Sequence, residues 1–585
     1  MKLRTGGQRS QSSEVLSALQ ACRQAVGGIA VFSAIINILM LSGSLYMLQV
    51  YDRVLSSRSI STLVGISLIL LAAYILQGSL DTLRSKMLAR VGARFDELLS
   101  GRIFDLIATL PLRGAKQADS MQPIRDLDNI RGFLSGTGPT ALFDMPFMPI
   151  FFACCFLIHP WIGVMSVGGG IIIVGLTILT EVKSRGPMSD LTRSLAERHV
   201  LAETSRRNAE ALKAMGMTPR IAALWQDAND KYMASQRRSS DVAGGFGSMS
   251  KVLRMMLQSG VLAVGAYLVI NGQASAGIII AGSILSARAL APVDLAIANW
   301  KGFVAARQSW QRLTRLLAMM PAQAAPMALQ PPERSLTVEN ATVAPPGSER
   351  IVVQDVSFSL QKGHGLGIIG PSGSGKSSLA RLLIGVWQPI RGRIRLDGAA
   401  FEQWPPEMLG ASTGYLPQDV ELLAGSVAQN IARFASPIDA DAVIAAATAA
   451  SVHDLIVSLP DGYETQVGEG GAALSAGQAQ RIALARALYG DPFLVVLDEP
   501  NSNLDAEGDE ALSRAIMGVR ARGGIVIVVA HRPSAIASVD LLLMMNQGRV
   551  QAFGPKEDVL AKVVQRDGVA PRPLKVVPEA GGAKP

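Results

Sequence analysis

Six apolar runs, each as long as a membrane-spanning helix, occupy the first half of the chain. An α-helix rises 1.5 Å per residue, so about 20 apolar residues cross the ~30 Å hydrocarbon core of a bilayer. Six runs of this length favour a membrane bundle over the buried helices of a soluble protein. The predicted spans are residues 26–50, 62–80, 140–158, 161–180, 252–270 and 276–298.

The connections between these runs alternate between short and long. Short turns join the first span to the second, the third to the fourth and the fifth to the sixth. The two remaining connections, 81–138 and 181–251, are long and rich in Arg and Lys. Basic loops stay on the cytoplasmic side of a membrane, so we expect both long connections and both termini in the cytoplasm. Spans two to five would then continue out of the membrane as long helices.

The pattern changes after residue 335 to short apolar strands that alternate with helices, which is typical of an α/β domain. An Ala/Pro/Gln-rich stretch precedes the change, and a Pro/Gly/Ala-rich tail ends the chain. The predicted organisation has a cytoplasmic N-terminal segment, a six-helix transmembrane domain with long cytoplasmic extensions, a linker, an α/β domain and a disordered tail. Their respective ranges are residues 1–25, 26–320, 321–335, 336–566 and 567–585.

Composition supports a membrane protein and argues against a nucleic-acid binder. The 585 residues exceed what one core can hold, and 49% are hydrophobic while only 17% are charged. The net charge of +9 is dispersed beside the apolar runs and forms no basic block with interleaved aromatics. Cys22, Cys154 and Cys155 fit no disulfide framework or metal spacing. Cys154 and Cys155 sit in an apolar segment and are expected to be plain packing residues. We find no cleavable signal peptide, so the first apolar run should remain a membrane helix.

A complete phosphate-binding loop follows the apolar strand predicted at 366–369. Residues 370–377 match the pattern G-x-x-x-x-G-K-[ST], and an amphipathic helix is predicted at 378–386. Glycines allow backbone N–H groups to surround phosphates, and the N-terminus of the helix adds positive potential. Lys376 would reach the β- and γ-phosphates, and Ser377 would hold Mg²⁺. The predicted nucleotide contacts are Gly370, Pro371, Ser372, Gly373, Ser374, Gly375, Lys376, Ser377 and Ser378.

Polar residues end two further strands of the predicted sheet. The continuous apolar run 493–497 leads into Asp498 and Glu499, and the run 525–530 leads into His531. Ligands bind at the carboxyl ends of parallel strands in such sheets. Asp498 would support Mg²⁺, Glu499 would polarise the attacking water, and His531 would reach the γ-phosphate. These groups supply the positioning and charge stabilisation that phosphoryl transfer requires.

The residues between the phosphate loop and Asp498 include Leu474-Ser-Ala-Gly-Gln478. With this signature, with LVVLDE at residues 494–499 and with Ser502-Asn-Leu-Asp505, the chain resembles an ATP-binding-cassette (ABC) transporter. The expected fold is therefore an α-helical six-span transmembrane domain fused to a C-terminal α/β P-loop nucleotide-binding domain. By the same resemblance, Gln418 in Tyr415-Leu-Pro-Gln418 is a catalytic and Mg²⁺-binding residue, and 465–470 (TQVGEG) is a loop that couples the two domains.

The resemblance also implies a homodimer. In this family ATP lies between the phosphate loop of one chain and the signature of the other. The signature residues implied to contact ATP are Ser475, Ala476, Gly477 and Gln478, together with Asp505. Two departures stand out. Ala476 replaces the usual glycine and adds a methyl group where the backbone approaches the γ-phosphate. Residues 341–347 offer no aromatic side chain to stack on adenine.

The membrane half resembles a particular branch of exporters. A membrane domain that precedes the cassette on one chain is the exporter arrangement. The strings at 46–55, 126–136 and 143–150 resemble the permease/ATPase subunits of type I secretion systems, in the PrtD-like branch that exports metalloproteases and lipases. The resemblance implies an unfolded polypeptide cargo with a C-terminal signal. It also implies a periplasmic adaptor (membrane fusion protein), an outer-membrane channel and a place in the bacterial inner membrane, with the nucleotide-binding domain in the cytoplasm.

Other functions stay open at this point. A lipid or drug flippase would need no adaptor, and lipids or apolar drugs would stimulate its ATPase activity. A nucleotide-gated channel or regulator would bind ATP without turnover, against which Glu499 and His531 argue. A DNA-associated ATPase lacks a base-reading element.

Ionisable residues within the spans are a separate question. Asp144, beside Pro146, is expected to face a cavity or a partner, because a charge in an apolar span is costly. Asp294 and Arg288 could neutralise each other. Tyr51, Asp52 and Arg53 are expected to anchor the membrane interface.

Overall fold

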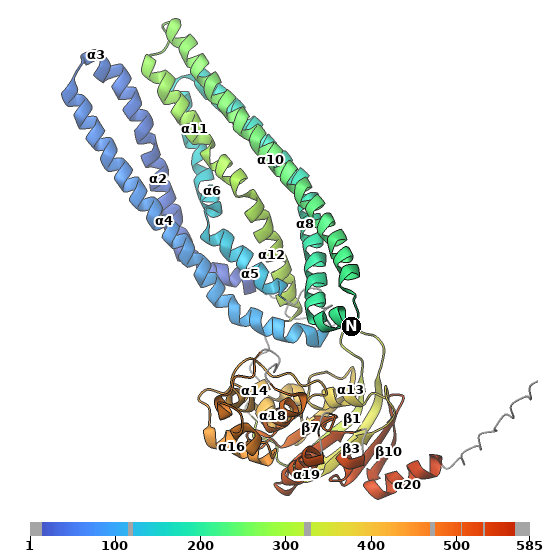
Figure 1. Cartoon of the computed structure of the whole chain (residues 1–585). Coiled ribbons are helices and arrows are strands. Elements are labelled where there is room, and N and C mark those ends of the chain that lie inside the picture. Colours follow the sequence, from blue (N-terminus) through green and yellow to red (C-terminus); the bar gives the residue numbers. More distant parts are fainter. Residues whose placement is uncertain are drawn as a thin grey trace, which may run out of the picture. The chain divides into compact units, whose positions relative to one another are not determined.

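The computed structural model describes residues 14–114, 121–320, 329–468, 474–502, 504, 506–530 and 533–567. The chain forms two compact units, one built from the helices before residue 321 and one from the strands and helices after it (Figure 1). The predicted linker lies partly outside the described residues, and so does the predicted disordered tail apart from Asp567. The domain limits given above therefore stay predictions.

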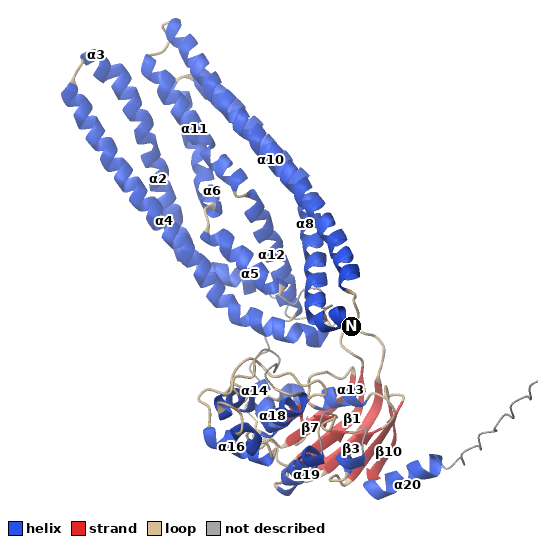
Figure 2. Ribbon diagram, viewed as in Figure 1, coloured by secondary structure: helices blue, strands red, loops and turns tan. Residues whose placement is uncertain are grey.

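Helices alone build the first unit (Figure 2). Six of its helical stretches are long and apolar enough to cross a membrane, and they contain the six predicted spans. The helical transmembrane domain is therefore confirmed. Its elements are α1 (Glu14–Ala21), α2 (Arg23–Gln49), η1 (Val50–Val54), α3 (Leu55–Ser57), α4 (Ile60–Thr109), η2 (Leu110–Arg113), α5 (Gln122–Ser135), α6 (Gly138–Asp144), η4 (Met145–Phe147), α7 (Met148–Ile158), α8 (Pro160–Arg207), α9 (Ala209–Ala214), α10 (Thr218–Ile270), α11 (Ala276–Ala298) and α12 (Trp300–Met319).

Three spans continue far beyond the length that a bilayer needs. Helices α4, α8 and α10 contain 50, 48 and 53 residues, which at 1.5 Å per residue is more than twice the ~30 Å hydrocarbon core. The long-helix prediction is wrong for the third span. The backbone of Gly136 is extended there, with φ −88° and ψ −169°, and it separates α5 from α6. Pro139, in the first turn of α6, favours the start of a new helix.

Helix α11 is the most enclosed of the six spans. It packs against α2, α6, α7, α8 and α10, and 56% of its most apolar window is buried. Gly277, Ala281 and Gly282 are buried on α11, and small residues let neighbouring helices approach closely. The surrounding core includes Cys155, and Cys154 packs against it; both are free thiols, as the packing prediction requires.

The second unit is an α/β domain with two sheets. The larger sheet has the strand order β10-β9-β3-β8-β7-β6, and β3, β6, β7, β8 and β9 run parallel. A smaller antiparallel sheet has the order β2-β1-β4-β5. The strands are β1 (Ser335–Val343), β2 (Val353–Gln361), β3 (Gly365–Ile369), β4 (Arg391–Leu396), β5 (Ala399–Ala400), β6 (Thr413–Leu416), β7 (Leu494–Asp498), β8 (Ile525–Val529), β9 (Leu541–Asn546) and β10 (Arg549–Pro555).

Most helices of the second unit lie between its strands along the chain (Figure 1). They are α13 (Lys376–Leu383), η5 (Phe401–Gln403), α14 (Pro406–Ser412), α15 (Val427–Ile431), α16 (Ala440–Ala449), α17 (His453–Val457), η6 (Gly462–Glu464), α18 (Ala476–Leu488), α19 (Ala506–Ala521), η8 (Pro533–Ile536) and α20 (Lys556–Asp567). Every residue of β7 and β8 is buried, as their continuous apolar sequences predict. The predicted α/β fold is confirmed.

Candidate nucleotide site

The phosphate loop connects β3 to α13 through glycines that no other residue could replace without strain. Gly370, Gly373 and Gly375 have φ values of 152°, 75° and 96°. A Cβ atom on Gly370 would lie 2.2 Å from the carbonyl oxygen of Met545, and one on Gly375 would lie 2.6 Å from that of Val352. The close backbone packing therefore requires glycine, and it leaves the start of α13 open to a ligand.

Lys376 lies across this loop and is only 5% exposed. Its Nζ donates hydrogen bonds to the carbonyl oxygens of Gly370 (2.9 Å) and Pro371 (3.0 Å). Burial lowers the pKa of Lys376, although the nearby carboxylates of Glu499 and Asp498 oppose the change. An anionic phosphate would satisfy this ammonium group better than neutral carbonyl oxygens do.

Asp498 ends β7 and is 1% exposed. Its Oδ1 accepts a hydrogen bond from the Ser377 hydroxyl at 3.1 Å, whereas its Oδ2 is buried with no hydrogen-bond partner among the described residues. Burial raises the pKa of the Asp498 carboxyl. Mg²⁺ prefers hard oxygen ligands and is usually held by one or two carboxylates together with substrate phosphates. The paired hydroxyl and the unpaired carboxylate oxygen fit that ion.

Glu499 follows in an unusual backbone conformation. Its φ is +51°, which costs a residue with a side chain on the order of 1–3 kcal/mol. Contacts from other segments hold this turn. The Glu499 N–H donates to the Val529 carbonyl oxygen at 3.0 Å, and the buried Gln480 amide donates to that of Pro500 at 2.6 Å. The strain was not evident from the sequence, and it occurs at the residue predicted to activate water.

The other predicted catalytic residues are only partly placed. Gln418 is exposed just after β6, which pairs with β7, so it lies at the same sheet edge as Asp498. His531 and Asp505 lie outside the described residues, as do residues 469–470 of the predicted coupling loop. Their roles stay predictions.

The signature residues form the first turn of α18. The Ser475 hydroxyl accepts a hydrogen bond from the Gln478 N–H (3.3 Å), and the Gln478 side chain accepts one from the Ser475 N–H (2.9 Å). This reciprocal capping box fixes the start of the helix. Gly477 and Gln478 line an open hollow of about 470 Å³ together with Leu455, Ser475, Arg481, Leu504 and Glu507. Ala476 is exposed in the same turn.

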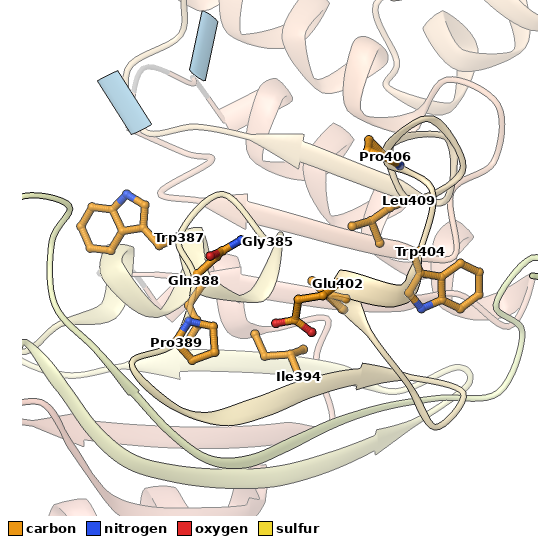
Figure 3. Close-up of a pocket in the computed structure, with 11 residues that line it drawn as sticks. Gly385, Trp387, Gln388, Pro389, Ile394, Glu402, Trp404, Pro406 and Leu409 are labelled. Carbon is orange, nitrogen blue, oxygen red and sulfur yellow. The ribbon is translucent and has the colours of Figure 1, made fainter. Parts of the chain in front are cut away.

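A second hollow, of about 200 Å³, lies between the segment after α13 and the segment around α14 (Figure 3). Trp387 lies on one side of it and the buried Trp404 on the other. None of the predicted site residues lines this hollow, and its residues form no motif that sequence reasoning could have recognised. We assign it no function.

Comparisons with known proteins identify the family. The ABC transporter transmembrane region matches residues 26–293, and the ABC transporter domain matches residues 353–502. The chain is also 56% identical over 577 residues to the type I secretion system ATP-binding protein PrsD of Rhizobium meliloti, which is 98% of this chain and 99% of that protein. The chain belongs to the ABC transporters of type I secretion.

More distant relatives agree. The transporter is 30% identical over 539 residues to the toxin RTX-I translocation ATP-binding protein of Actinobacillus pleuropneumoniae. It is 30% identical over 548 residues to the alpha-hemolysin translocation ATP-binding protein HlyB of Escherichia coli. Each match covers 91% of this chain and 76% of the relative. A solved bacterial Atm1-family ABC exporter with ATP bound has the same fold, with a TM-score of 0.80 and 24% identity over 94% of this chain and 97% of its own. As a member of its family, the transporter binds and hydrolyses ATP to drive export.

Proposed function

We propose that this transporter exports an unfolded polypeptide with a C-terminal secretion signal, as the ATPase of a type I secretion system in the bacterial inner membrane. The identity of 56% along almost the whole chain to a type I secretion protein carries this proposal. The names of two relatives refer to toxin and hemolysin translocation, which supports a polypeptide cargo. The cassette would lie in the cytoplasm, where ATP is available.

The active form would be a homodimer with two composite sites. One chain carries one phosphate loop and one signature, and the first turn of α18 borders an open hollow that a second chain could fill. Each site would then combine Gly370–Ser378 of one chain with Ser475–Gln478 and Asp505 of the other. Such a site forms only when two cassettes meet, so hydrolysis would depend on their association.

The chemistry would be divided among the residues at the end of the sheet. Lys376 and the N–H groups of the loop would hold the phosphates. Mg²⁺ would neutralise phosphate charge, held by Ser377, Asp498 and Gln418. Glu499 would accept a hydrogen bond from the attacking water and orient it, and His531 would contact the γ-phosphate. The strained backbone of Glu499 supports this role, because strained residues cluster at active sites. Phosphoryl transfer depends mainly on positioning and charge stabilisation.

A type I system places this transporter beside an adaptor and an outer-membrane channel. The adaptor would be a periplasmic membrane fusion protein that contacts the membrane domain, and the channel would complete the path out of the cell. The membrane domain itself would cross the lipid bilayer with its six spans. The positive charge of the chain would serve membrane orientation and not nucleic-acid binding.

The experiment that tests this function measures ATPase activity of the purified transporter in lipid nanodiscs. C-terminal fragments of secreted proteins encoded beside its gene are the probes, and N-terminal fragments of the same proteins are the control. We expect only C-terminal fragments to change the rate. A response to lipids or apolar drugs, with none to any fragment, would instead indicate a flippase.

A further inference from the structure

Arg288 lies near the middle of the membrane span α11. It is twelve residues from Ala276 and ten from Ala298, the two ends of the helix. At 1.5 Å per residue these separations are about 18 Å and 15 Å. The backbone of Arg288 therefore lies near the centre of a ~30 Å hydrocarbon core, whichever end of the helix is taken as the start. A charge at this depth needs a physical explanation.

The expected partner of Arg288 is bound elsewhere. Asp294 pairs with Arg254 of α10, with 2.5 Å between a carboxylate oxygen and a guanidinium nitrogen. The prediction that Asp294 neutralises Arg288 is therefore wrong, because residues six apart on a helix do not share a face. Arg288 is exposed, and no described residue forms a hydrogen bond or ion pair with it.

Asp144, a charged residue of another span, shows what a satisfied charge looks like. Asp144 is 8% exposed and accepts hydrogen bonds from Arg84 at 3.0 and 3.2 Å and from Asn37 at 2.9 Å. Its charge is neutralised within the protomer. The charge of Arg288 must be neutralised or solvated by something outside the described protomer.

Lipid is a poor environment for this side chain. An arginine at the centre of a bilayer is costly, so such residues face a water-filled cavity or a partner. The environment of α11 agrees, because neighbouring helices enclose most of this span (Figure 1). Arg288 is nevertheless exposed, and the other exposed residues of α11, Ala276 and Ala298, are its two ends.

We propose that Arg288 lines the aqueous path through the membrane domain and binds acidic side chains of the polypeptide in transit. The inference rests on the proposed function, and in the homodimer it would place one guanidinium from each protomer on the path. A guanidinium binds carboxylates in bidentate fashion. Arg288 is thus a specificity-determining residue that assists acidic segments of the cargo.

Thiol labelling tests the position of Arg288 without any cargo. The variant Arg288→Cys is made in a background in which Cys22, Cys154 and Cys155 are replaced by alanine and export is retained. We expect a membrane-impermeant maleimide to label it. The matched control is Ile171→Cys, which is 67% exposed and eleven residues from the start of α8, at nearly the same depth. Labelling of Arg288→Cys by a lipid-soluble maleimide only, as expected for Ile171→Cys, would refute the inference.

Export of modified cargo tests the specificity. A secreted protein that carries a poly-aspartate insert is compared with one that carries poly-asparagine. We expect Arg288→Gln to slow export of the aspartate form relative to the asparagine form about fivefold, the effect of an ion pair worth about 1 kcal/mol. Arg288→Lys should restore most of the ratio. An unchanged ratio in Arg288→Gln refutes the inference but leaves the proposed function intact, whereas wild-type protein that exports neither form refutes the proposed function.

Discussion

Buried charges are treated differently in the two units of this transporter. In the helical unit, Arg84 is 6% exposed and donates hydrogen bonds to Asp144, Ser33 and Asp81. Asp126 is fully buried and accepts hydrogen bonds from Arg312 and from the Ser309 hydroxyl at 2.8 Å. In both clusters, partners from other helices of the same chain satisfy the carboxylates.

The α/β unit leaves comparable charges incomplete. Asp498 is more buried than Asp144, yet its Oδ2 has no partner among the described residues. The hydrogen bonds of the Lys376 ammonium group go to backbone carbonyl oxygens in its own loop. A buried charge that forms no direct ion pair destabilises a protein unless a ligand supplies one. Completed charge pairs therefore stabilise the fold, whereas incomplete ones indicate where a ligand binds. Substitutions in both units can test this comparison.

Replacement of Glu499 by glutamine should separate binding from chemistry. The amide cannot accept a proton from water, so we expect the rate of phosphate release to fall about 10²–10⁴-fold. ATP binding should persist, and the protein should stall as a closed dimer. Phosphate release and size-exclusion chromatography with ATP measure the two effects. Turnover equal to that of the wild type would show that Glu499 does not activate water.

Removal of one member of a completed pair should destabilise the helical unit. In Arg84→Ala the Asp144 carboxylate loses its counter-charge, at an expected cost of about 3–5 kcal/mol. Thermal unfolding in lipid nanodiscs measures the loss. The matched control is Arg94→Ala, which breaks an exposed pair with Glu97 on the same helix and should cost less than about 1 kcal/mol. Equal effects of the two variants would contradict the comparison.

Replacement of an incomplete charge should have the opposite effect. Burial raises the pKa of the Asp498 carboxyl in the folded protein above its value in the unfolded chain. The folded protein therefore has its full stability below the unfolded pKa and loses stability as the pH rises through the folded pKa. At pH 7 the nucleotide-free protein carries the full penalty, which Asp498→Asn removes. We expect the variant to have a higher Tm, by about 2–4 °C for each kcal/mol gained, and no ATPase activity.

Acidic pH is the control for this variant. The gain in Tm should shrink as pH falls toward the ordinary pKa range of aspartate, where the wild-type carboxyl is also neutral. A Tm of Asp498→Asn below that of the wild type at pH 7 would mean that the Asp498 charge is satisfied in the folded protein.

The smallest loss of stability should come from the removal of an exposed carboxylate whose hydrogen bonds are satisfied. Asp52 is exposed, and its carboxylate accepts hydrogen bonds from the Gly277 N–H (2.9 Å) and the Ser275 hydroxyl (2.7 Å) at the start of α11. Asp52→Ala removes this cap and should cost about 1 kcal/mol by thermal unfolding. Asp52→Asn keeps an acceptor oxygen and should cost less. If Asp52→Ala left the Tm unchanged, the cap would not contribute to stability, and Asp52 would keep only the role expected from the sequence, that of an anchor at the membrane interface.

Local pattern was enough to predict most elements of this protein. The six spans follow from the length of apolar runs, and β7 and β8 follow from continuous apolar sequence that ends in polar residues. The phosphate loop, the signature and the order of the motifs identified the family, because each is a short stretch whose chemistry depends on neighbours in the chain.

The tertiary structure alone decided which charges meet. Asp144 is 60 residues from Arg84 and 107 from Asn37, and no local pattern connects them. The pairing of Asp294 with Arg254, the unpaired Arg288 and the strained backbone of Glu499 likewise depend on how distant segments pack. The physical reason is that hydrophobic periodicity fixes which face of a helix is buried, whereas the partner of a polar group depends on which helices lie against that face.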